Sequence, residues 1–169
     1  MSLDMQINYC KKVIIDSTYN IKYLAGFSKR RPGIHCGPKC LECGIIIFDR
    51  RFILISIDVL YISDDLRDYI FDIIFETFGV GSESVCVVAS HTHSAPNISY
   101  DIFGELDYGF IEQLKKTIKT CIEEANKNTA SCRVNFSCTS NLNGIVVYRR
   151  KLGRDIRSFF LTKKNVNAT

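Results

Sequence analysis

The chain has 169 residues, of which 46% are hydrophobic, and a formal net charge of +4. This length suits a single domain with a substantial core, and the apolar content excludes a disordered chain. The weak and dispersed positive charge argues against a nucleic-acid surface, and no apolar stretch is long enough to cross a membrane.

The first predicted elements lead to a β-hairpin. Residues 13–25 form a mixed apolar segment, interpreted as a strand followed by a turn, and residues 28–38 form a loop rich in basic residues, Pro and Gly. Residues 45–48 and 52–57 are apolar runs separated by Asp-Arg-Arg, which predicts two strands joined by a tight turn.

A helix with clear end signals follows the hairpin. Ser63 is a candidate N-cap, two aspartates suit the first turn, and Gly79 suits the C-terminal end. The apolar run of residues 85–89 predicts the next strand. A strand, a helix and a strand of these lengths form a crossover unit, so strands 52–57 and 85–89 are expected to be parallel neighbours.

The second half of the chain predicts another helix and two more strands. Residues 108–127 carry apolar side chains at helical spacing, with a predicted buried stripe of Phe110, Ile111, Leu114, Ile118, Cys121, Ile122 and Ala125. Alternation over residues 132–139 predicts a half-exposed strand, residues 145–148 a further strand, and residues 158–169 a polar tail. The predicted fold class is α/β, with a mixed, partly parallel sheet and packed helices in one domain.

The tripeptide His91-Thr92-His93 is the strongest functional signal. It contains two of the three histidines and stands between the apolar run 85–89 and a Pro-containing loop. Side chains alternate along a strand, so both imidazoles are expected to point the same way. They suit a divalent metal, or one metal ligand and one proton carrier. The alternative is a pair of hydrogen-bonded histidines without metal.

Three other residues are candidates for the same site. Asp58 lies near the carboxyl end of strand 52–57, where ligands of parallel sheets gather. It is interpreted as a metal ligand or as an acceptor that orients an imidazole, and the alternative is a cap or loop hydrogen bond. Arg149 and Arg150 follow a predicted strand and are candidates for stabilising negative charge, the alternative being a solvated basic pair.

The sequence holds eight cysteines. The N-terminal residues lack the apolar region of a signal peptide, so we expect a cytoplasmic protein with reduced thiols. Cys36, Cys40 and Cys43 have the C-x3-C-x2-C spacing of radical SAM enzymes, which hold an iron–sulfur cluster. A second alternative is a zinc site formed by these three thiolates and His35.

Several segments of the chain resemble the neutral/alkaline non-lysosomal ceramidase family. The resemblance is most specific over VCVVASHTHSAP at residues 85–96, and it covers roughly residues 20–152. Looser matches are Gly33-Ile34-His35, residues 45–49, residues 53–60 with Ser56 and Asp58, residues 110–126, and Val147-Tyr148-Arg149-Arg150. Ala95 stands where the family usually has Gly, and residues 36–40 look like a short insertion.

The resemblance implies a zinc-dependent amide hydrolase acting on an N-acyl lipid or a related amide. It implies that His91 is a zinc ligand, that His93 contacts substrate or assists proton transfer, and that Arg149 or Arg150 stabilises charge. The family's remaining zinc ligands come from a later part of its longer chains, so only the amino-terminal part of the catalytic domain is matched. A non-catalytic, ceramidase-like binding domain is therefore the main alternative, and a homo-oligomer is a further expectation.

Overall fold

The structure is a computed structural model that describes residues 2–21, 24–26, 40–100, 105–135 and 138. The chain divides into two compact units, one of Leu3–Val134 and one of Met1–Ser2 with Asn135–Thr169. The first unit contains nearly all of the described residues. His35, Cys36, Arg149, Arg150 and the strand predicted at 145–148 lie outside the described residues.

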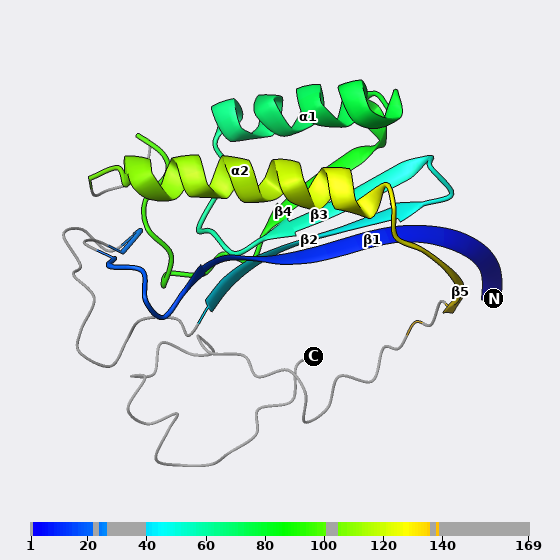
Figure 1. Ribbon diagram of the computed structural model, residues 1–169, viewed down its shortest axis with the longest axis horizontal. Coiled ribbons are helices and arrows are strands. Elements are labelled where there is room, and N and C mark those ends of the chain that lie inside the picture. The colour runs from blue at the N-terminus through cyan, green and yellow to red at the C-terminus, as the bar shows by residue number, and fades with distance from the viewer. Residues whose placement is uncertain (1, 22–23, 27–39, 101–104, 136–137, 139–169) are drawn as a thin grey trace, which may run out of the picture. The chain divides into compact units, whose positions relative to one another are not determined.

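A five-stranded mixed sheet forms the base of the fold (Figure 1). The strand order is β4-β3-β2-β1-β5, and the strands are β1 (Ser2–Asp16), β2 (Cys40–Phe48), β3 (Phe52–Ile57), β4 (Val85–Ala89) and β5 (Thr129–Asn135). β2 pairs with β1 and β3 in antiparallel fashion, and β3 pairs with β4 in parallel. The predicted α/β class, the hairpin of β2 and β3, and the parallel β3–β4 pair are all confirmed.

Two helices, α1 (Asp64–Phe78) and α2 (Tyr108–Ala125), lie on the same face of this sheet (Figure 1). Ser63 caps α1 by accepting a hydrogen bond from the Leu66 amide, and Gly79 ends it in the left-handed conformation with φ +66°. A short 3₁₀ turn, Ser82–Ser84, leads into β4. Neither helix combines the length and the apolar composition of a membrane span, as far as the described residues go.

The core lies between the helices and the sheet. β2 alternates strictly, with its odd-numbered residues from Leu41 to Ile47 buried and the residues between them more exposed. The stripe predicted for α2 is buried except for Ile111, which is only half-buried. Thr117 is buried as well, because its hydroxyl donates to the Gln113 carbonyl at 2.7 Å and is thereby satisfied.

β1 carries polar residues on its inward face, where they hold the end of α2. The buried Asn8 amide donates to the Ala125 carbonyl and to the Thr129 hydroxyl, each at 3.1 Å. Lys12 forms an ion pair with Glu124 at 2.6 Å. These contacts fix the first strand to the connection between α2 and β5.

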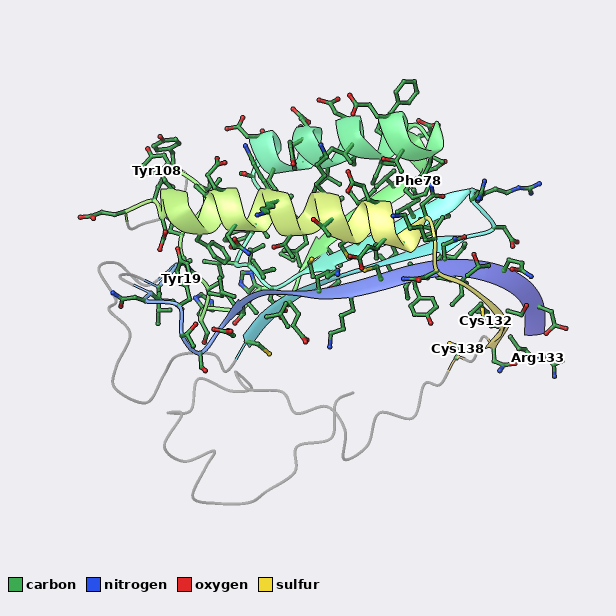
Figure 2. The ribbon with its side chains drawn as sticks, viewed as in Figure 1. Tyr19, Phe78, Tyr108, Cys132, Arg133 and Cys138 are labelled. Carbon is green, nitrogen blue, oxygen red and sulfur yellow. The ribbon has the colours of Figure 1, made fainter. Side chains whose placement is uncertain are left out.

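The other end of α2 is fixed by Asp107 and Tyr19. The Asp107 carboxylate accepts hydrogen bonds from the Phe110 amide at 3.0 Å and from the Tyr19 hydroxyl at 2.9 Å. Figure 2 shows Tyr19 beside the amino end of the helix, close to where Tyr108 begins it. The helix is therefore held to the segment after β1 at its start and to β1 itself at its end.

Candidate functional site

The segments that leave β3 and β4 lie side by side at one edge of the sheet. Because the two strands are parallel, their carboxyl ends meet at the same edge, which is where ligands of such sheets bind. The Ser90 amide donates to the Ile57 carbonyl at 3.0 Å and keeps the segments together one residue past β4. Residues 58–61 after β3 and residues 90–96 after β4 form the candidate site.

His91 is held in a defined orientation and tautomer. Its backbone is left-handed, with φ +58°, a conformation that costs energy for a residue other than Gly or Asn. Its Nδ1 lies 3.0 Å from the Leu60 carbonyl oxygen, and the Tyr61 ring contacts it edge-on at a centroid distance of 5.0 Å. A carbonyl can only accept, so Nδ1 carries a proton, and in the neutral ring the lone pair is then on Nε2.

His93 lies next to His91, although not for the reason that the sequence suggested. The ring centroids are 5.3 Å apart and the ring planes are inclined by 79°. The expectation that both rings point the same way rested on strand alternation, but β4 ends at Ala89 and the chain turns at His91, so alternation is not what brings the rings together. The turn brings the exposed His91 and the half-buried His93 together at the sheet edge.

A segment far away in the sequence also borders the site. Leu24 forms an isolated antiparallel bridge with Pro96, and the Ala25 amide donates to the Ala95 carbonyl at 2.8 Å. Leu24, Ala25 and Ala95 are almost completely buried. This segment was not predicted from the sequence as part of the site; the signal available was the Leu-Ala-Gly sequence just before the basic loop.

Asp58 is engaged with the neighbouring strand β2. Its Oδ2 accepts a hydrogen bond from the Glu42 amide at 3.0 Å, and its own amide donates to the Glu42 carbonyl at 2.9 Å. β2 and β4 flank β3 on opposite sides, so this bond to β2 turns the Asp58 carboxylate away from β4, the strand that leads to the two histidines. The structure thus shows the loop hydrogen bond that was the alternative for Asp58, while its role as a metal ligand stays a prediction.

The metal site itself is not complete within the described part of the chain. No group of three or more His, Cys, Asp or Glu side chains is placed there to hold one ion. Arg149 and Arg150 are outside the described residues, so their roles stay predictions.

The cysteine alternatives fare differently. Cys40 and Cys43 both belong to β2, where Cys40 is exposed and Cys43 faces the core under the helices. Two thiolates on opposite faces of one strand cannot reach the same ion. The iron–sulfur interpretation and the four-ligand zinc interpretation both need this pair, and this arrangement argues against both.

Cys43 instead belongs to a buried group of thiols with Cys10 and Cys121. Burial, followed by a hydrogen bond with Cys121, raises the pKa of Cys10 from 9.0 to about 12. A hydrogen bond with Cys43, followed by burial, raises the pKa of Cys121 still further. Thiols with raised pKa values stay protonated at neutral pH, so Cys10 and Cys121 are core residues rather than nucleophiles.

Comparison with known proteins supports a ceramidase-like fold. No family model matches the sequence, and no curated protein matches it significantly. Among solved structures, the chain is similar to the neutral ceramidase from Pseudomonas aeruginosa, with a TM-score of 0.57 and 20% sequence identity. The match covers 75% of this chain but only 22% of that chain. The chain therefore shares its fold with part of a neutral ceramidase.

Proposed function

We propose that this chain forms part of the catalytic domain of a zinc-dependent hydrolase that cleaves the amide bond of an N-acyl lipid or a related amide. One observation carries the proposal: a ceramidase-like fold places two neighbouring imidazoles where β3 and β4 end, with His91 oriented by the Leu60 carbonyl. Histidines that bind metals are usually oriented in this way, by a hydrogen bond from the second ring nitrogen.

The donor chemistry of His91 fits zinc. Neutral imidazole is a preferred zinc ligand, and the bond from Nδ1 to Leu60 leaves Nε2 to bind the ion. A catalytic zinc needs at least three protein ligands, and His91 with the predicted ligand Asp58 gives only two, so at least one further ligand of the proposed centre comes from outside the described residues. On its own, the present set of side chains supports weak zinc binding.

The remaining residues have distinct proposed roles. Bound zinc would polarise the amide carbonyl and lower the pKa of a bound water. His93, adjacent to His91, contacts the substrate or moves a proton, and Arg149 or Arg150 stabilises negative charge. The cytoplasmic location and self-association stay predictions.

The proposal is tested by the zinc content and the zinc affinity of the full chain. We expect zinc in protein purified without chelator, and an affinity that falls at least about tenfold in His91→Asn. Asparagine tolerates the left-handed backbone of residue 91, so this variant removes the imidazole without adding strain. Ser90→Ala, one residue away and exposed, is the matched control and should bind zinc as the wild type does.

Two further results refine the assignment. Asp58→Asn keeps an oxygen that can accept from the Glu42 amide, so a loss of zinc affinity in this variant would identify Asp58 as a ligand. Release of fatty acid from a fluorescent N-acyl sphingosine then tests hydrolysis directly. Wild-type protein that binds no zinc, or binds it equally well without His91, would leave a non-catalytic ceramidase-like domain as the better description.

A further inference from the structure

We infer that Gly26 is a positioning residue for His93, because the missing side chain at position 26 leaves the space that the imidazole fills. The inference deepens the proposed function, since it assigns a residue that sets the place of the second imidazole in the same site. Its geometric part concerns the protein alone and does not depend on bound zinc.

The His93 ring lies so close to Gly26 that position 26 has no room for a side chain. A Cβ atom at position 26 would lie 2.7 Å from His93 Nδ1 and 3.0 Å from Cε1 of the same ring. It would also lie 3.1 Å from the Leu60 side chain. Separations under 3.0 Å are essentially never seen for real Cβ atoms, so an alanine at position 26 forces the ring or the backbone to move.

The surroundings of Gly26 prevent the backbone from yielding easily. The preceding residues are fixed to the loop that follows His93, through the Leu24–Pro96 bridge and the bond from the Ala25 amide to the Ala95 carbonyl. Both Leu24 and Ala25 are only 1% exposed. The imidazole, which is half-buried, is therefore the part that has to move.

Leu60 links the space beside Gly26 to His91. Its side chain borders the space beside Gly26, while its carbonyl accepts the hydrogen bond from His91. A side chain at position 26 would therefore press both on the His93 ring and on the residue that orients His91. In the proposed site, the absence of a side chain at Gly26 thus matters for both imidazoles.

A double-mutant cycle separates this steric role from the backbone role of the glycine. Gly26 has φ +75°, so alanine there is strained whatever the space around it. Gly79 is the matched control, because it has φ +66° but nothing within 4 Å of its would-be Cβ. Gly79→Ala should lower the thermal midpoint by about 3 °C, the effect of strain alone in a chain of this size.

The four variants give a clear expected pattern. Gly26→Ala should lower the midpoint by at least twice as much as Gly79→Ala. In a His93→Ala background only the strained backbone and the 3.1 Å contact with Leu60 remain, so Gly26→Ala should cost clearly less than it does in the wild type. An equal loss from Gly26→Ala with and without the His93 ring would overturn the inference.

A second measurement reports on ring position rather than on stability. Gly26→Ala should shift the imidazole resonances of His93 and weaken the magnetisation transfer between His91 and His93, whereas Gly79→Ala should leave both unchanged. Unchanged resonances in Gly26→Ala would also refute the positioning role. If the wild-type protein binds zinc, its affinity should fall in Gly26→Ala by about fivefold or more. If the wild type binds none, the proposed function fails, and the cycle and the resonances still decide the role of Gly26.

Discussion

Cys40 and Cys43 illustrate how much a single residue's place in a strand decides about its chemistry. Their spacing alone suggested a shared metal, but the pleat of β2 directs one thiol to solvent and the other into the core. The sequence could not show this, because the strand was expected to begin only at Ile45. The two cysteines and the glutamate within residues 40–43 obscured the apolar alternation at the start of the strand.

The two cysteines should therefore differ strongly in reactivity. In native protein treated with a maleimide, Cys40 should be labelled at once, while Cys43, Cys10 and Cys121 should be labelled at least about 100-fold more slowly. The reason is that the buried thiols become accessible only when the structure opens. Mass spectrometry of peptides after timed labelling measures each rate, and equal rates for Cys40 and Cys43 would contradict the strand assignment.

His91 and Gly26 mark the limit of prediction at this scale. The sequence drew attention to the histidine pair, and the structure places the two rings next to each other. The sequence could not reveal the left-handed backbone of His91, nor the approach of Gly26, which comes from a segment about 65 residues earlier in the chain. Asp58 looked equally suited to the site, and its bond to β2 became visible only in three dimensions.

Among the elements, those with explicit end signals were predicted best. Ser63 and Gly79 bracket α1 as expected, and α2 begins at the predicted Tyr108. β1 was missed over most of its length because its inward positions include Asn8 and Lys12, which disguise the usual alternation. Those polar residues are buried or half-buried because the end of α2 supplies their partners, and no local pattern can show that.

The start of α2 offers a test at the scale of the element. Asp107→Ala should lower the free energy of unfolding by about 2 kcal/mol, because the helix loses its cap and Tyr19 loses its acceptor. Tyr19→Phe should cost about 1 kcal/mol, the usual value of one hydrogen bond. Urea denaturation measures both. The double variant should cost less than the sum, and strict additivity would show that the two side chains do not interact.

At the scale of the whole molecule, the Tyr19 phenol and the Cys10 thiol make the free energy of unfolding depend on pH in the alkaline range. Burial, followed by the bond to Asp107, raises the pKa of Tyr19 from 10.0 to about 12, and the pKa of Cys10 rises from 9.0 to about 12. The unfolded chain releases the Cys10 proton above pH 9 and the Tyr19 proton above pH 10, while the folded chain keeps both. The unfolded state is thereby favoured, so stability is full below pH 9 and declines as the pH rises towards 12.

We expect the free energy of unfolding to fall by about 1.4 kcal/mol per pH unit for each group, from pH 9 for Cys10 and from pH 10 for Tyr19, up to about pH 12. Cys10→Ala should make this decline shallower, because it removes one of the groups. Cys40→Ala, which removes an exposed thiol on the other face of β2, is the control and should keep the wild-type slope. Urea titrations at a series of pH values measure the slopes, and identical slopes for both variants would rule out Cys10 as a source.

The bond between the Tyr9 amide and the Asn128 carbonyl joins residues that are made at very different times. A ribosome releases β1 first and β5 last among these strands, so the growing chain holds one side of β1 without its neighbour for most of its synthesis. The side-chain amide of Asn8 likewise has no acceptors until residues 125–129 have been synthesised. The nascent sheet therefore stays open along β1 until almost all of the Leu3–Val134 unit has emerged, and this is the interval in which a chaperone would have an unpaired strand to bind.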